Sequence, residues 1–265
     1  MPTKPRLAAR LMLLGSALFC ALPSALAQQV QSQPPSQPQP PPPAGDQYVG
    51  RFLVYAGYMF LDSPKINLFE PGIHIQAGMR WSRHISVGFD YSHSSGSTSI
   101  GLSQATAALQ NEFDPILAGF IAAGLVPPNY AAVLPFSSVT QTFTAGPEFP
   151  YRRFKRFTPY IRPSAGIINE IATAHPTDEL TRIVVNAVAP SGHEEEWTAF
   201  YGFGGGVAFN VTKHFSLVVQ GDFVHDHLFP DLLRTGRNTF RFSVGPGFQF
   251  GSNVTKKWGI PGHWE

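Results

Sequence analysis

One long stretch near the end of the chain alternates between two chemically different faces. From Thr239 to Gly251, every second residue is a large apolar side chain or a proline: Phe240, Phe242, Val244, Pro246, Phe248 and Phe250. The residues between them are small or polar and include Arg241. Because successive side chains of a β-strand point to opposite faces of the sheet, this pattern predicts a strand between lipid and a narrow polar lumen.

The same period of two recurs along the chain. It predicts strands at residues 51–61, 72–82, 85–95, 139–153, 157–170, 197–211, 215–229 and 235–251. Short polar turns at 82–84, 154–156 and 212–214 alternate with longer loops, as in membrane-spanning barrels, whose short turns all lie at one rim. We therefore predict an all-β fold over residues 48–252, a transmembrane eight-stranded antiparallel up-and-down β-barrel.

A soluble sandwich or lipocalin-like barrel would alternate in the same way. Its dry core, however, would then hold glycines, serines, arginines and acids, which are costly to bury without full pairing. Its surface would expose far more aliphatic and aromatic area than soluble proteins normally do. The membrane barrel avoids both problems, and the pattern favours it.

Two details of the strands stay open. Pro147, Pro159, Pro163 and Pro246 lie inside predicted strands, where each removes a backbone donor, so we expect bulges or rim positions there. In the first strand both faces are apolar. We expect the even-numbered face to point outward, although the odd-numbered face is nearly as apolar.

Six charged residues share the inward parity. They are Arg80, Asp90, Glu148, Arg162, Asp222 and Arg241. Eight strands enclose a lumen that side chains about fill, so one interpretation is a set of mutually satisfied ion pairs that hold the barrel together. The other interpretation is a gated path for ions.

The N-terminal residues have the features of export. Lys4, Arg6 and Arg10 precede an apolar run and a small-residue cleavage pattern, which predicts a signal peptide over 1–27, cleaved near Ala27. Residues 28–47 are mostly Gln, Pro, Ser and Ala and predict a disordered linker, and 253–265 would form a short tail. Cys20 falls inside the predicted signal peptide, which would leave the exported protein without a thiol.

Composition agrees with this interpretation. Only 14% of the residues are charged, and glycine and proline number 25 each, a mixture that favours strands and turns over helical bundles. The net charge of +2 gives no sign of a nucleic-acid partner. No later run is long and apolar enough for a transmembrane helix. We predict no cofactor and no metal.

With its eight strands and final motif, the chain resembles the small OmpA/OmpX-type outer-membrane proteins, the porin family of outer-membrane β-barrel domains. The motif is similar to their assembly signal, carried here by Ser243, Gly245, Phe248 and Phe250. The resemblance implies a location in the bacterial outer membrane, contact with its lipid, and recognition by the barrel-assembly machinery. The chain departs from the family pattern by continuing past Phe250.

The long loops carry the remaining candidate chemistry. Within 96–138, Ser103 could cap one short helix, and Asp114 with Pro115 could start a second that ends at Gly124. The loop at 171–196 carries several acids and two histidines without a fixed ligand spacing, which is typical of a solvated surface.

His225 and His227 share a face of the seventh strand near its outer end, and could hold a metal or supply a base for a serine. We can match no motif of the barrel enzymes here, and we predict that the protein is not an enzyme. The leading hypothesis is a structural or interaction protein whose barrel is an anchor and whose outer loops contact a ligand. A small pore and a lipid-modifying enzyme are the alternatives.

Overall fold

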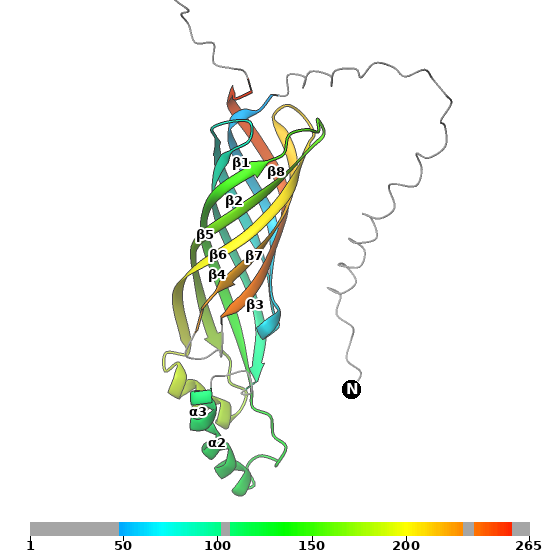
Figure 1. The fold of residues 1–265 in the computed structure, drawn as a ribbon. Coiled ribbons are helices and arrows are strands. Elements are labelled where there is room, and N and C mark those ends of the chain that lie inside the picture. Colours follow the sequence, from blue (N-terminus) through cyan, green and yellow to red (C-terminus); the bar gives the residue numbers. More distant parts are fainter. Residues whose placement is uncertain (1–47, 102–106, 230–235, 256–265) are drawn as a thin grey trace, which may run out of the picture. The chain divides into compact units, whose positions relative to one another are not determined.

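The chain forms a closed barrel of eight antiparallel strands that follow one another around the barrel in sequence order. The computed structural model describes residues 48–101, 107–229 and 236–255 (Figure 1). The strands are β1 (Gly50–Ser63), β2 (Leu68–Arg80), β3 (Ser86–Gly101), β4 (Val133–Pro150), β5 (Phe157–Ala174), β6 (His193–Asn210), β7 (Phe215–Asp226) and β8 (Arg237–Asn253). The predicted fold class is confirmed, whereas the predicted signal peptide, linker and Ser103 cap lie outside the described residues.

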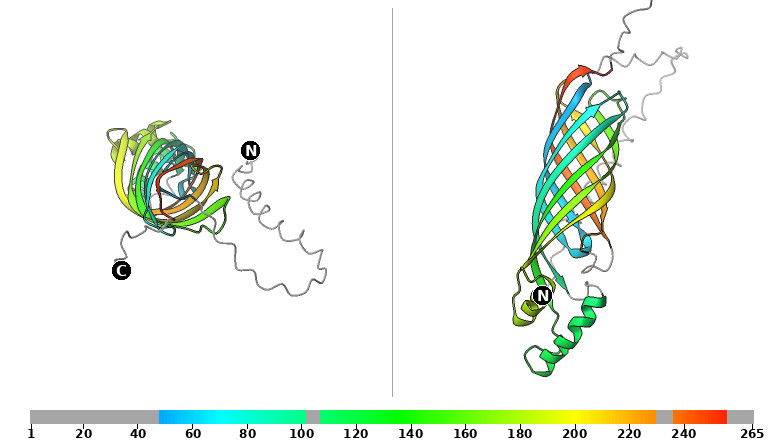
Figure 2. Two further views of the ribbon diagram at one scale, coloured as in Figure 1. Left: turned by 90° about the horizontal axis from the view of Figure 1, so that it is seen from above. Right: turned by 90° about the vertical axis from the view of Figure 1, so that its left-hand side faces the viewer.

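The three predicted tight turns are confirmed, but the β1–β2 connection at the other end, residues 64–67, is as short as they are. Figure 2 shows the tight turns at one end of the barrel, together with the start of β1 and the end of β8, and the helices at the other end. We call these ends the turn rim and the helical rim. Side chains close two of the turns, because Ser82 Oγ accepts from the backbone of Ile85 (3.1 Å) and Thr212 Oγ1 accepts from that of Phe215 (3.0 Å). Short polar residues thereby satisfy backbone donors that the strands leave free.

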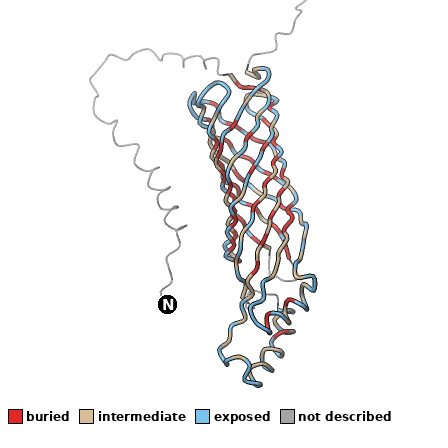
Figure 3. The backbone as a smooth tube through the Cα atoms, turned by 180° about the vertical axis from the view of Figure 1, so that it is seen from behind, coloured by how far each residue is buried: buried red, intermediate tan, exposed pale blue. Residues whose placement is uncertain are grey.

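Burial alternates along most of each strand, so that buried and exposed positions succeed one another around the barrel (Figure 3). In β1, Tyr55 and Met59 are buried while Tyr58 is 51% exposed, which confirms the expected facing of this strand. The buried residues are mostly polar or charged, and the exposed ones include many large hydrophobics. This distribution is the inverse of that in a soluble protein.

The strand prolines do not form bulges. Pro147 of β4 and Pro163 of β5 lie opposite each other, where the β4–β5 pairing is interrupted between Ala145 and Phe149 and resumes in the same register. Pro246 lies in a similar gap of the β1–β8 pairing. The one register shift in that pairing is at Gly50, not at a proline. A proline lacks an N–H but keeps an extended backbone, so it removes bonds without adding a residue.

Several predicted boundaries were wrong at the helical rim. Strand β3 runs to Gly101 and β4 begins at Val133, so the loop between them is shorter than predicted. The acidic segment 171–196 is not a single loop: β5 runs through its start, β6 through its end, and helix α3 (Glu179–Val188) lies between. A 3-10 turn, η1 (Pro64–Ile66), joins β1 to β2.

The two helices predicted around Asp114 are one helix, α2 (Ala107–Ala122), with Pro115 inside it. Proline removes one backbone bond of the preceding turn, and the apolar residues on both sides, including Phe113 at 2% exposure, favour a continuous helix despite that loss. Neither described helix is apolar over a length sufficient to cross a bilayer.

Candidate functional site

A buried cluster of charges crosses the middle of the barrel. Arg162 of β5 contacts Asp90 of β3 (Nη1–Oδ2, 2.7 Å) and Asp222 of β7 (Nη2–Oδ2, 3.2 Å). Arg241 of β8 contacts the same carboxylate (Nη2–Oδ2, 2.9 Å). Two guanidinium groups and two carboxylates therefore balance in the lumen, each almost inaccessible to solvent. The structure brings these four of the six inward residues together.

Neutral groups complete this central cluster. His74 of β2 lies 3.5 Å from Asp90, and its Nδ1 is 3.0 Å from Ser243 Oγ and 3.1 Å from Gln220 Nε2. Arg241 donates to Thr142 of β4 (3.0 Å). The cluster joins six strands across the lumen. Since a buried ion pair repays its desolvation only with further hydrogen bonds, these neutral partners are part of what makes it stable.

A glycine makes room for the central cluster. Gly204 of β6 pairs with Asp222, and a Cβ at this position would collide with the Asp222 carboxylate. The inward face of β6 also has glycine at positions 202 and 206. The glycines of β6 therefore leave space for side chains of the neighbouring strands β5 and β7, among them the carboxylate of Asp222.

A second charged cluster lies nearer the helical rim. Arg237 of β8 contacts Glu170 of β5 (Nη2–Oε2, 2.6 Å) and Asp226 of β7 (Nε–Oδ2, 3.4 Å), and all three are buried. Glu70 of β2 accepts from Ser94 (2.8 Å) and from Ser138. None of these four charged residues is among the six predicted for the lumen. Glu170, Asp226 and Arg237 nevertheless lie within predicted strands at inward positions, and Glu70 lies just before the predicted start of β2.

Apolar side chains fill the lumen around the second cluster and beyond it toward the helical rim. This apolar plug consists of Ile66, Leu68, Phe136, Ile168, Phe200, Val224, Leu228 and Phe229. They come from η1, from five strands and from the residues after β7. Together with the two charged clusters, the plug fills the barrel from its middle to the helical rim.

The remaining two predicted lumen residues, Arg80 and Glu148, lie near the turn rim and form no ion pair with each other among the described residues. Arg80 donates to the Gly50 carbonyl (3.1 Å) and to Gln249 Oε1 (2.5 Å), and Glu148 accepts from Ser86 (3.0 Å). Equal numbers of opposite charges on one face do not by themselves produce pairs.

The histidine pair at the helical rim has neutral neighbours. His225 Nδ1 is 2.6 Å from Asn238 Oδ1, and the His225 and His227 rings are 4.9 Å apart. Asp226, between them in sequence, points into the lumen and pairs with Arg237. No group of three metal-ligating side chains occurs in the part of the chain that the structure describes.

Most acids of segment 171–196 have structural partners. Asp178 caps α3: its Oδ1 accepts from the Thr181 backbone (2.8 Å), and Thr181 Oγ1 accepts from the Asp178 backbone (3.2 Å). Glu195 accepts from Asn169 (2.8 Å) and Trp197 (3.1 Å). The segment is exposed to solvent at Asp178, Glu179 and Glu195, and some of these acids also form caps and strand contacts.

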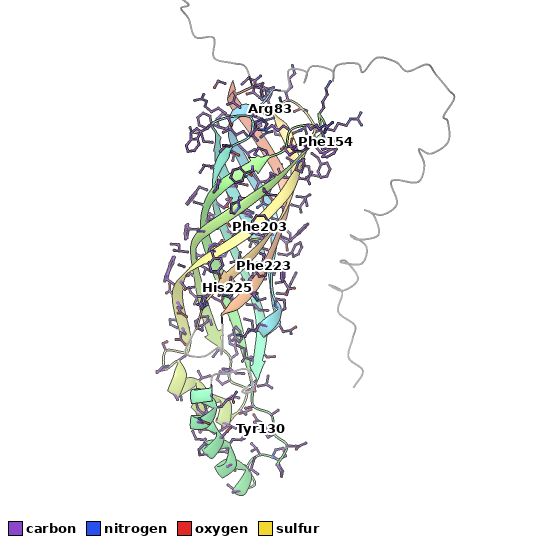
Figure 4. The ribbon with its side chains drawn as sticks, viewed as in Figure 1. Arg83, Tyr130, Phe154, Phe203, Phe223 and His225 are labelled. Carbon is purple, nitrogen blue, oxygen red and sulfur yellow. The ribbon has the colours of Figure 1, made fainter. Side chains whose placement is uncertain are left out.

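A single side-chain bond ties the segment after α2 to the start of α3. Tyr130 donates to Asp178 Oδ2 (2.5 Å), in the helical lobe, which comprises α2, α3 and their flanking residues (Figure 4). The hydrogen bond to this carboxylate, with some burial, raises the pKa of Tyr130 to about 12. Burial alone would raise the pKa of Asp178, but bonds from Thr181 and Tyr130 lower it overall.

The predicted assembly residues lie where β8 meets β1 and β7. Ser243 and Gly245 point inward, and a Cβ at Gly245 would collide with the backbone of β1. Phe248 and Phe250 point outward, where Phe248 contacts Phe215 (ring centroids 4.9 Å apart) and Phe250 contacts Phe52 of β1 (5.5 Å). Recognition of these residues by an assembly machinery stays a prediction.

No protein-family model matches the chain, and no curated protein matches its sequence. Similar solved structures include Ail, the attachment invasion locus protein of Yersinia pestis, in complex with the heparin analogue sucrose octasulfate: 11% identity, 75% of this chain and 96% of Ail covered, TM-score 0.41. Neisserial surface protein A has the same identity and coverage and a TM-score of 0.44. The N-terminal β-barrel domain of Pseudomonas aeruginosa OprF has 11% identity, with 76% and 100% covered and a TM-score of 0.39.

Substituting Gly204 by alanine is expected to push Asp222 away from Arg162 and to lower the free energy of unfolding by about 1–3 kcal/mol. Urea unfolding in detergent, followed by tryptophan fluorescence, measures the change. Gly221→Ala is the matched control, because its Cβ points outward and meets only a carbonyl oxygen at 3.9 Å. It should stay within about 0.5 kcal/mol of wild type. Equal effects of the two substitutions would contradict this prediction.

The Tyr130–Asp178 bond is expected to be pH-dependent at both ends. A raised tyrosine pKa means that its contribution is complete below pH ~10 and is lost as pH rises toward about 12. Because the pKa of Asp178 is lowered, the stabilisation from its ionised carboxylate is present above pH ~4 and is lost on acidification. A difference titration at 295 nm, wild type minus Tyr130→Phe, should show the high midpoint. Asp178→Asn should return it toward ~10, and an unchanged midpoint would refute the coupling.

Proposed function

We propose that the protein is an integral outer-membrane barrel that does not conduct, and that it anchors the helical lobe as a contact surface for other molecules. The outward face of every strand supports the membrane location. Exposed large hydrophobics on that face include Ile73 and Phe89 at one side and Phe203, Phe223 and Phe242 at another. Such a face would be a large apolar patch in water and is well solvated in lipid.

Strand β6 supports a bilayer-sized span. Its outward residues begin with Trp197 near the helical rim and continue to Val211 at the turn rim. At ~3.3 Å per residue and a tilt of ~45°, this stretch covers ~30 Å along the barrel axis, close to the thickness of a hydrocarbon core. Exposed Trp81 and Tyr151 at the turn rim, with Trp197 at the other, supply aromatic residues for both interfaces.

The observation that carries the non-conducting role is the filled lumen. Arg162 reaches carboxylates on two other strands, so its side chain crosses the lumen, and the apolar plug closes the same lumen at the helical rim. A passing ion would have to break buried ion pairs and lose its hydration among hydrophobic side chains. The few hydrogen bonds available in the lumen do not compensate for that desolvation cost. A small pore, the alternative function, needs a continuous path instead.

The helical lobe is then the part of the described chain that projects from the barrel and can contact other molecules. It presents acids that are exposed to solvent, including Asp114, Asp178 and Glu179. Surface loops that connect rigid strands commonly carry binding functions. We propose no catalytic role, because the ring nitrogen of His225 bonds an asparagine and Asp226 is directed away from it.

A charge at the middle of the outward face tests the membrane location. Phe203 lies midway along the outward stretch of β6, and Phe154 lies in a tight turn at the rim (Figure 4). In phospholipid vesicles, Phe203→Arg should lower the free energy of unfolding by about 2–4 kcal/mol and Phe154→Arg by at most ~1 kcal/mol. A soluble protein would show no such dependence on depth.

Planar-bilayer recordings test the filled lumen. The wild-type barrel should insert, as shown by heat-modifiable gel migration, without steady openings, while a general porin in the same bilayer verifies the assay. Steady openings whose size changes in Asp222→Asn would show that the charged cluster lines a path, and would replace the anchoring role with the pore.

A further inference from the structure

A small cavity lies inside the barrel near the turn rim and plays no part in the proposed anchoring role. It measures about 30 Å³, room for two or three water molecules at ~10–15 Å³ each. Its lining includes Gln76, Arg80, Glu148, Arg152 and Gln249. It is lined by charged side chains that are themselves more than nine-tenths buried: Arg80 and Arg152 are 7% exposed and Glu148 is 6% exposed.

The charges of this cavity do not balance. Neither Arg80 nor Arg152 lies within salt-bridge distance of a carboxylate in the described residues. Two guanidinium groups against the single carboxylate of Glu148 leave one positive charge uncompensated. An unpaired buried charge is strongly destabilising, so a counter-charge is needed.

Every buried side-chain atom of the lining that lacks a partner can donate a hydrogen bond. Arg80 Nε, Gln76 Nε2 and the Tyr55 hydroxyl have no partner among the described residues, and of these only the hydroxyl can also accept. Arg152 donates through Nε to the Arg83 carbonyl (3.1 Å), while Arg83 donates to the Arg152 carbonyl (3.0 Å), and this reciprocal pair fixes the arginine between two tight turns. Donors that lack acceptors are complemented by an anion and not by a cation.

The pKa of Arg152 agrees with a missing counter-charge. Burial and the neighbouring Arg80 lower this pKa to about 9, and Glu148 offsets only part of the effect. Arg152 therefore keeps its charge at neutral pH. The three tight turns also expose Arg153, Lys155, Arg156 and Lys213 and contain no acid in 81–85, 151–156 or 211–214. A rim of one sign raises the local concentration of small ions of the other sign.

We infer that this cavity binds one small monovalent anion, a halide or a small oxyanion, held by Arg80, Arg152 and Gln76. One bound anion neutralises the excess charge and supplies the acceptor that the buried donors lack. The size of the cavity excludes organic anions such as gluconate. Binding here needs neither membrane insertion nor the helical lobe, so the inference stands apart from the proposed function.

Two substitutions move the charge of the cavity in opposite directions. Arg152→Gln makes it neutral and should abolish anion dependence, whereas Glu148→Gln leaves two positive charges and should strengthen it. Lys155→Gln removes an exposed cation of the same turn and should behave like wild type. Wild type and the three variants are all studied as the full-length protein in detergent, in which the barrel that holds the cavity is intact.

The first measurement is urea unfolding in sodium chloride, sodium nitrate and sodium gluconate at equal ionic strength. For wild type, once chloride exceeds its dissociation constant, each tenfold rise should lower the unfolding equilibrium constant about tenfold. The second measurement is ³⁵Cl NMR line broadening, which should appear with wild type and Lys155→Gln and vanish with Arg152→Gln or on competition by nitrate.

The inference is overturned if Arg152→Gln and wild type respond equally to chloride, or if neither chloride nor nitrate differs from gluconate for wild type. Should Arg152→Gln fail to fold, Glu148→Gln decides the matter, because a response no larger than that of wild type contradicts the charge argument.

Discussion

The barrel depends on the position of one guanidinium group. Arg162 projects from β5 and reaches carboxylates on β3 and β7, so a single side chain ties three strands across the lumen. In a closed barrel these charges cannot turn toward solvent, and removing one partner leaves a buried charge whose cost is commonly ~3–5 kcal/mol. Gly204, Thr142 and Ser243 are explained by this constraint, because they make room for the charges or hydrogen-bond to their neighbours.

That constraint also separates the two faces of each strand. A soluble barrel hides its apolar side chains inside and leaves charges in water, whereas here the charges occupy the interior and neutralise one another at its centre. The outward face is then free to be uniformly apolar, as the exposed rings of Phe203, Phe223 and Phe240 illustrate. The ion pairs and the apolar plug that occupy the lumen are the basis of the proposed anchoring role.

The sequence alone predicted the strand order, the inward parity and the facing of β1, because a period of two is a local property. It missed strand ends at the helical rim, because β2 already begins at Leu68, before Glu70, and β3 runs on to Gly101, through segments that resemble polar loops. Glu170 and Arg237 lie within predicted strands, but their ion pair was not predicted. The sequence alone also did not predict which charged side chains pair with each other. That Arg162 meets Asp90 and Asp222, while Arg80 meets no carboxylate, depends on register and closure across the barrel, which no single segment encodes.

The helices show a similar limit. Pro115 indicated a helix start, but tertiary packing around Phe113 outweighs the loss of one backbone bond. The capping box of Asp178 and Thr181 lies among the acids of 171–196, where a spacing of three residues before an apolar run is a sequence signal for a helix start.

The charges are ordered along the barrel axis. Near the turn rim Arg80 and Arg152 exceed Glu148, at the centre the pairs balance, and toward the helical rim Arg237 faces three acids, Glu70, Glu170 and Asp226. The exposed residues follow the same order, with basic turns at one end and an acidic lobe at the other. At each end of the barrel, the charges in the lumen and those on the surface have the same sign, so their electric fields add. The low-dielectric barrel wall between them screens these fields little. The turn rim therefore carries a positive field and the helical lobe a negative one.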